Sequence, residues 1–410
     1  MVNCRSVCLF AAVLLAVANP ALAEPVTYKG KLGKTGIVVE LTDDPATSGD
    51  KAIAGRYLYL SQGADIPLQA KSHKGSALEL AEEEACKDQC EQGKPGPVGA
   101  IWKLSASADG KTLEGSWVGK KTLPVKLERV AGRTIDGEAP KTPLDLYNYT
   151  DQTFVVEANP VTIKTSPYDY LRLDVALTAG EKQGWADASY HDVTDPRTQF
   201  ARPRIVELAG GVAPDAANAV LHARHWRDSL AALGCKALQY GGFQEYGPMP
   251  GAGDGLGDYD GTISEVTALT PRLMSWRESG SVFCGGAHPY NYSEAYTIDV
   301  RNGQYFGLQD MFKDVVDGAP GPSLVAFVKE TRKKSTDQVD IAFEAECGTD
   351  DLIAQYLAGS TKREGDSLKL VFGLQGLPHA IQACGDDLLE LPVADAEQLL
   401  TPGFAELLAK

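Results

Sequence analysis

The stretch that decides the fold of the second half of this chain is residues 281–312, SVFCGGAHPYNYSEAYTIDVRNGQYFGLQDMF. An alternating run at residues 296–300 is followed by Asn302 and Gly303, and then by residues 305–308. Alternation with a period of two, broken by Asn-Gly, predicts two strands joined by a tight hairpin. The glycine pair just before the first strand permits positive φ angles or close backbone approach. Residues 308–312 predict the start of a short helix.

The segments on either side of this stretch mix helical and strand-like patterns. Residues 213–234 have apolar residues at three-to-four spacing, with Pro214 at the start and Gly234 as the expected C-cap. The other helices are expected at residues 323–334, 350–357 and 394–400, and the strands at residues 153–156, 171–177, 265–278, 367–374 and 388–393. Helices among antiparallel-looking strands predict an α+β region with an antiparallel sheet over residues 151–410.

The N-terminal part, residues 24–130, is rich in strand patterns. Eight short runs separated by Gly, Asp, Ser and Lys turns lie at residues 26–32, 36–41, 53–60, 65–70, 76–81, 98–105, 112–118 and 123–129. Even spacing of this kind predicts an all-β domain, either an up-and-down barrel or a small sandwich. A barrel of this size either holds a small apolar ligand or fills its interior with its own aromatic side chains, and we favour the filled interior. Residues 131–150 are polar with Gly and Pro, which is typical of a linker.

The first 23 residues have the pattern of a secretory signal peptide. Arg5 precedes an apolar core at residues 9–17, and Ala21 and Ala23 form a small-residue cleavage site. No later stretch is long and apolar enough to predict a membrane span. We therefore expect a periplasmic or secreted protein. The net charge of −16 argues against nucleic acid as a partner and is compatible with a basic protein partner.

Six of the eight cysteines lie beyond the signal peptide, and an even number in an exported chain predicts disulfides. Cys86 and Cys90 are four residues apart and are expected to pair locally. Proximity makes Cys235 a plausible partner for Cys284. The remaining pair, Cys347 with Cys384, would close the C-terminal part.

No complete catalytic or metal-binding motif is present, so we predict no catalytic residues, no metal and no cofactor. His222 and His225 lie three apart on one predicted helix but lack a third ligand. Ser279 and Ser281 stand near His288 in sequence, which does not by itself make a catalytic triad. His288 is either a contact residue or a histidine that hydrogen-bonds the adjacent turn, and we favour the turn.

The chain resembles the extracellular domain of unknown function found in RsiV-type anti-sigma factors and in PdaC-type peptidoglycan deacetylases. The resemblance is carried by GGAHP at residues 285–289, Y-x-I-D-x-x-x-G at residues 296–303 and L-x-D-M-F at residues 308–312. A weaker match covers residues 370–381, with Pro378, His379 and Ala380. It spans about residues 150–405 and leaves out the N-terminal strands. In this family the RsiV-type domain is a receptor for lysozyme, so the resemblance implies a protein-binding module.

The leading hypothesis is a non-enzymatic periplasmic protein that binds a basic cell-wall-associated protein such as lysozyme. Gly285, Gly286, His288 and Tyr290 are the predicted contact residues. One alternative is a cell-envelope hydrolase that acts on peptidoglycan with His288 as the acid/base. The other is a carrier of small apolar ligands through the N-terminal barrel.

Overall fold

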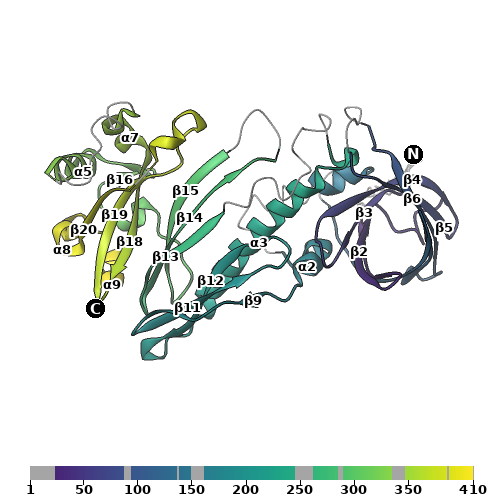
Figure 1. Ribbon diagram of the computed structural model, residues 1–410, viewed down its shortest axis with the longest axis horizontal. Helices are drawn as coiled ribbons and strands as arrows, with labels where there is room; N and C mark the ends of the chain where they lie inside the picture. The colour runs from purple at the N-terminus through teal and green to yellow at the C-terminus, as the bar shows by residue number, and fades with distance from the viewer. Residues whose placement is uncertain are drawn as a thin grey trace, which may run out of the picture.

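The fold is taken from a computed structural model, which describes residues 24–86, 94–135, 138–148, 161–244, 262–284, 290–334, 347–385 and 387–409. Figure 1 shows an elongated arrangement with a β-barrel at one end, a long helix leading away from it, and sheets and helices at the other end. No helix in the described part of the chain has the length and hydrophobicity that a membrane crossing requires.

The N-terminal strands close into an up-and-down antiparallel barrel in the order β1 to β8, with β8 pairing β1. The strands are β1 (Val26–Leu32), β2 (Thr35–Leu41), β3 (Gly55–Tyr59), β4 (Asp65–Lys74), β5 (Ala77–Glu83), β6 (Val98–Ala106), β7 (Thr112–Val118) and β8 (Thr122–Gly132). This confirms the predicted barrel and rules out the sandwich. Consecutive strands pair throughout, most of them joined by short turns that leave no room for crossovers, whereas longer connections at residues 42–54 and 84–97 join β2 to β3 and β5 to β6.

The barrel interior is filled by alternating side chains of the strands. Tyr28, Tyr57 and Trp102 are all fully buried in this core, among aliphatic residues from the other strands. Tyr57 meets Trp102 edge to face, with ring centroids 4.9 Å apart. Side chains therefore occupy the space that a ligand carried inside the barrel would need.

A short helix, α2 (Pro167–Leu173), covers the outside of the barrel over β2 and also contacts β1 and β8. Tyr168 and Leu171 pack against Val38 and Leu58, which face away from the barrel interior. The alternating apolar residues at 171–177 predicted a strand here, and that prediction is wrong: residues 171–173 belong to α2, residues 174–177 form no strand, and the next strand begins at Thr178. Pro167 fits the first turn of a helix, and the apolar side of α2 is buried against the barrel.

Buried charges surround this helix and form what we call the clamp cluster. Its members are three arginines and three carboxylates, Arg56, Arg133, Arg172, Glu40, Asp65 and Asp169, each no more than 2% exposed. The charges balance within the cluster, which is the condition under which burying them is tolerated.

Arg56 lies at the centre of the clamp cluster. Its guanidinium is 2.8 Å from Glu40 and 3.2 Å from Asp65, and it stacks 4.2 Å from the centre of the Tyr168 ring. Burial alone would lower the pKa of Arg56, but Glu40 and Asp65 outweigh it and raise that pKa. Arg172 of α2 donates to the carbonyl of Gly63 at 2.6 Å, so backbone and charge contacts hold α2 on the barrel together.

Part of the segment predicted as a linker is anchored to the barrel. β8 continues to Gly132, and the next residue, Arg133, lies 2.9 Å from Glu40 as a buried ion pair. Ile135 and Leu146 are also buried. The composition of this segment is polar, but the buried ion pair between Arg133 and Glu40 fixes its start against the barrel.

The long helix α3 (Asp215–Ala237) connects the barrel to the second half of the molecule. Twenty-three residues make a rod of about 35 Å. Ala217 and Leu221 enter the core under the neighbouring sheets, whereas Leu233 near the other end lies against Gly63 of the barrel. Gly234 was predicted as the C-cap, but the helix continues for three more residues. The hydroxyl of Tyr147 donates a hydrogen bond to the backbone carbonyl of Gly234 at 3.0 Å.

Two antiparallel sheets and their core, which includes Trp276, lie beside α3. The first contains β9 (Thr178–Ala179), β10 (Gln183–Trp185), β11 (Ala188–Thr194) and β12 (Ala201–Leu208). The second contains β13 (Ile263–Leu269), β14 (Leu273–Val282) and β15 (Tyr290–Asp299), in that order. Single-turn 3-10 helices follow β12 and α3, at η1 (Ala209–Gly211) and η2 (Gly241–Phe243).

The C-terminal elements surround a separate core. They are α4 (Leu308–Met311), β16 (Val315–Val316), β17 (Ala319–Pro320), α5 (Pro322–Lys334), α7 (Thr349–Tyr356), β18 (Leu357–Glu364), β19 (Ser367–Leu374), η4 (His379–Cys384), β20 (Asp387–Pro392), α8 (Val393–Ala396), η5 (Glu397–Leu399) and α9 (Pro402–Leu408). This half contains helices and antiparallel sheets together, which confirms the α+β prediction. The predicted last helix at residues 394–400 is instead α8 followed by η5, and α9 was not predicted.

The hairpin predicted within residues 296–308 forms only in part. The turn is present, with Gly303 at a φ of 73°, but the second strand is reduced to one bridge between Ile298 and Tyr305. β15 pairs along its whole length with β14 on its other edge. After the turn, the amide of Phe306 still donates to the Thr297 carbonyl at 2.9 Å, but α4 begins at Leu308, so the chain leaves the sheet before a second strand can form.

Replacing Arg56 with methionine tests the clamp cluster. We expect Arg56→Met to lower the free energy of unfolding by about 3–5 kcal/mol, because three buried carboxylates then face too few cations. Urea unfolding of the full chain measures this. The matched control is Lys126→Met, which removes an ion pair whose lysine and glutamate side chains are 74% and 62% exposed and should change little. Equal stability of the two variants would show that the cluster does not stabilise the fold.

Candidate functional site

Of the predicted contact residues, the structure describes the backbone of Tyr290. Gly285, Gly286 and His288 lie outside the described residues. Tyr290 is the first residue of β15, and its backbone pairs with Val282 of β14. The described surface that continues from these residues is the first half of β15.

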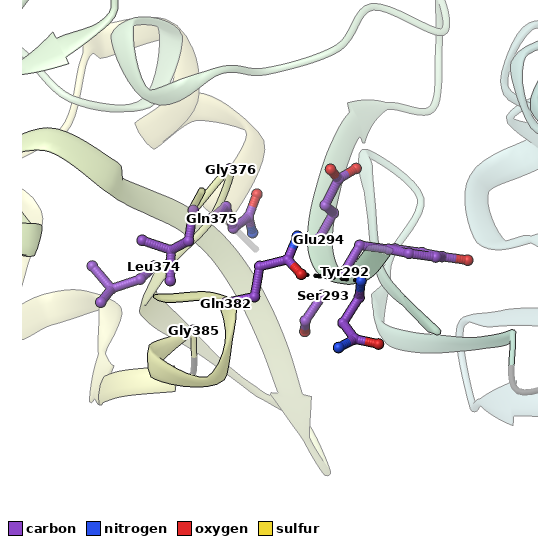
Figure 2. Close-up of a pocket in the computed structure, with 10 residues that line it drawn as sticks. Tyr292, Ser293, Glu294, Leu374, Gln375, Gly376, Gln382 and Gly385 are labelled. Carbon is purple, nitrogen blue, oxygen red and sulfur yellow. Dashed lines mark hydrogen bonds between the residues drawn. The ribbon is translucent and has the colours of Figure 1, made fainter. Parts of the chain in front are cut away.

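A groove runs along the first half of β15, and we call it the β15 groove. Its cavity volume is about 110 Å³. One wall is formed by Asn291 to Glu294, and the other by residues after β19 and in η4, including Gln375 and Gln382 (Figure 2). Amide, hydroxyl and carboxylate groups therefore dominate the side chains around it.

Gln382 of η4 spans the groove. Its Oε1 accepts the backbone N–H of Asn291 at 3.1 Å, and Figure 2 shows this bond as a dashed line. His379 Nδ1 lies 3.2 Å from the same oxygen. The structure thus brings the block around Pro378 and His379 next to the strand that follows the GGAHP block, although the two are about 90 residues apart.

Disulfides anchor both walls. Cys235 near the end of α3 is bonded to Cys284, directly before the GGAHP block, and Cys347 is bonded to Cys384 at the end of η4. These are the two pairs that proximity in sequence suggested. Cys86 is also disulfide-bonded, whereas Cys90, its expected partner, lies outside the described residues.

The first half of β15 offers an unpaired edge. Because the Asn291 amide points to Gln382, away from β14, the amides of Ser293 and Ala295 point the same way. Farther along, the same edge is occupied, since the Thr297 carbonyl accepts from the amide of Phe306 at 2.9 Å. Within the described part of the chain, no hydrogen bond engages the amides of Ser293 and Ala295. An extended peptide would find donors and acceptors here.

A buried ion cluster supports this sheet from the side of α3. Arg224 of α3 donates to both oxygens of Glu278 on β14, with Nε at 2.7 and 2.8 Å. The Trp276 indole N–H donates to the same carboxylate at 2.8 Å, and Arg224 lies 3.7 Å above the Tyr296 ring. These contacts lock β14 and β15 onto α3.

The carboxylates near this cluster titrate in opposite directions. Burial alone would raise the pKa of Glu278, but hydrogen bonds from Arg224 hold it below its ordinary value. Burial and the Glu278 charge raise the pKa of Asp228, against the opposing effect of Arg202, whose Nε lies 2.9 Å from it. Opposed shifts of this kind can mark an acid/base pair, but they also occur in structural ion networks.

The two histidines of α3 are both engaged by one arginine. Arg204 Nη2 lies 3.2 Å from Nδ1 of His222 and 3.2 Å from Nδ1 of His225. A guanidinium can only donate, so both Nδ1 atoms act as acceptors. Across the described ranges, no group of three or more His, Cys, Asp and Glu side chains could hold a metal ion.

Ser279 and Ser281 both lie on β14, opposite Ser293 and Asn291 of β15. With His288 outside the described residues, the structure neither assembles nor excludes a serine–histidine pair. What the described geometry offers chemically is recognition through backbone groups and polar side chains.

Comparison with protein families finds no family model that matches the chain, and comparison with curated proteins finds no match. The resemblance to the RsiV-type domain therefore rests on the residues quoted for it.

Sequence reasoning missed Gln382 and the open amides of β15, since no local pattern marks either. The sequence contained part of the information needed to find the Arg224–Glu278 pair. Strand spacing puts Trp276 and Glu278 on one face, and helix spacing puts Arg224 and Asp228 on one face. That Arg224 meets Glu278 is a tertiary contact, which no local spacing indicates.

The titration of His225 generates a pH prediction. Burial, first, and the charge of Arg204 lower its pKa to about 3. The unfolded chain binds this proton below about pH 6.5, so acidification favours unfolding. Between pH 7 and pH 5 we expect this histidine alone to reduce the free energy of unfolding by about 2 kcal/mol.

Urea unfolding of the wild type and of His225→Asn at both pH values measures this contribution. The variant should lose correspondingly less stability on acidification, whatever its stability at pH 7. His379→Asn, at an exposed position, serves as the control substitution of a second histidine. Parallel pH curves for wild type and His225→Asn would refute the assignment.

Proposed function

We propose that this protein is a non-enzymatic binding protein of the cell envelope, and that the β15 groove with the adjoining start of β15 is its contact surface. The observation that carries the proposal is the unpaired edge at Ser293 and Ala295, held between disulfide-anchored walls. Strand addition to such an edge supplies affinity through main-chain hydrogen bonds, while neighbouring side chains supply specificity.

The proposed compartment is the periplasm or the exterior. The first 23 residues read as a signal peptide, and structural disulfides persist in oxidising compartments. Both observations support an exported protein.

The proposed partner is a basic cell-wall-associated protein such as lysozyme. The net charge of −16 would speed the encounter with a cationic protein, and Glu294 adds a carboxylate to the groove itself. The lysozyme class comes from the resemblance of residues 285–312 to the RsiV-type domain.

A second candidate is a hydrolase acting on peptidoglycan with His288 as the acid/base. The opposed pKa shifts of Asp228 and Glu278 favour it. Against it, the Glu278 carboxylate is already committed to Arg224 and Trp276. The third candidate, an apolar carrier, is disfavoured by the filled barrel interior.

Calorimetry of the full mature chain with a c-type lysozyme, at low and moderate salt, tests the proposal. We expect saturable binding that survives moderate salt. Ser293→Pro should weaken it at least tenfold, because proline removes the edge N–H while leaving the bonds to β14 in place. Changing His288 and Tyr290 together should also weaken it.

The matched control is Gln355→Ala, at an exposed position on α7, which should bind like the wild type. Absence of binding, or binding that disappears with a little salt, would reduce the lysozyme idea to nonspecific charge attraction. Loss of a peptidoglycan-hydrolysing activity in His288→Ala, with folding intact, would favour the hydrolase instead.

A further inference from the structure

A second concave surface lies at one end of the barrel, and we call it the barrel-mouth hollow. It opens beside the turns that join β1 to β2, β3 to β4 and β7 to β8, with a cavity volume of about 840 Å³. Pockets for small ligands occupy about 300–1,000 Å³, so the hollow is of ligand size. Its lining shares no residue with the β15 groove.

Trp117 and Tyr59 give the hollow an aromatic wall. Trp117 is fixed from behind, because its indole N–H donates to Glu82 at 2.7 Å. The N–H of Trp102 donates to the same carboxylate oxygen, also at 2.7 Å. Glu82 thus orients an indole ring that lines the hollow, which is the support that a preorganised binding surface needs.

The carboxylate of Glu82 is partly buried. Burial raises its pKa, while the hydrogen bonds from Trp102 and Trp117 act in the opposite direction. Tyr57, fully buried, packs edge to face on Tyr59 at 5.5 Å and closes the way into the barrel core. A ligand would therefore rest on the aromatic wall without entering the barrel.

The rim of the hollow carries positive charge on an otherwise acidic protein. Lys34 and Lys121 line it, both exposed, and no acidic residue does. Neither lysine forms an ion pair within the described residues. Hydroxyl and amide groups of Ser61 and Gln62 complete the polar side.

These features select one kind of ligand. An apolar molecule would leave the lysines and polar side chains unused, and a cation would be repelled by the two ammonium groups. A sugar ring can lay its C–H face on an indole, bond its hydroxyls to Ser61 and Gln62, and place an acidic group near the lysines. We propose that the barrel-mouth hollow binds a saccharide that carries a carboxylate.

Titration of the full mature chain with a tetrasaccharide containing glucuronate, followed by calorimetry and tryptophan fluorescence, tests this. We expect saturable binding that is weakened at least tenfold when the carboxylates are methyl-esterified. The double variant Lys34→Gln, Lys121→Gln should lose a similar factor and should no longer distinguish acid from ester. Trp117→Phe keeps a ring but loses the bond to Glu82, and should lose both affinity and the fluorescence response.

The matched control is Lys111→Gln with Lys126→Gln, two exposed barrel lysines outside the hollow, which should bind like the wild type. A melting curve for each variant confirms folding. Equal binding of acid and ester, or unchanged binding by the variant at Lys34 and Lys121, would overturn the proposal. Because these lysines lie outside the β15 groove, their replacement should leave lysozyme binding intact.

Discussion

The clamp cluster is the constraint on which the arrangement of this protein depends. Arg56, at its centre, is fully buried, so its charge is tolerated only while Glu40, Asp65 and Asp169 remain beside it. Asp169 belongs to α2 and the other three to the barrel, so the ion pairs of Asp169 with Arg56 and of Arg172 with Asp65 cross from one part to the other. The cluster therefore joins the barrel to the chain that follows it more selectively than apolar contact would, since a shifted α2 would leave charges buried without partners.

From this junction, α3 extends the arrangement to the candidate site. It contacts the barrel at Leu233, carries Arg224 to Glu278, and ends near the disulfide of Cys235. The sheet that carries β15 is thus held to α3 by an ion pair and by the disulfide between Cys235 and Cys284, which follows β14. A rigid edge loses little conformational freedom when it accepts a partner strand, which is why a binding role suits this geometry.

The barrel was the part of the fold most accessible from the sequence, since its strands form short runs that pair in chain order, most of them across short turns. Local patterns failed where tertiary contacts competed with them. Residues 171–173 alternate like a strand but form part of α2, because the barrel surface offers the helix an apolar face and charge partners. Gly234 has the identity of a C-cap, yet the helix passes through it. At the candidate site, the glycine-rich block drew attention to the start of β15, but nothing local marked Gln382 or the open amides opposite it.

The sequence by itself indicated an all-β N-terminal domain of eight strands and the α+β character of the second half, because these follow from patterns within single segments, and it suggested two of the disulfides from proximity alone. Only the tertiary structure decided which charges are buried together, which edge of β15 stays open, and which aromatic side chains line the barrel mouth. Those depend on residues such as Arg56 and Asp169, or Asn291 and Gln382, that lie about 90 to 110 positions apart. Their meeting is set by how whole elements pack, and no periodicity in a single segment encodes it.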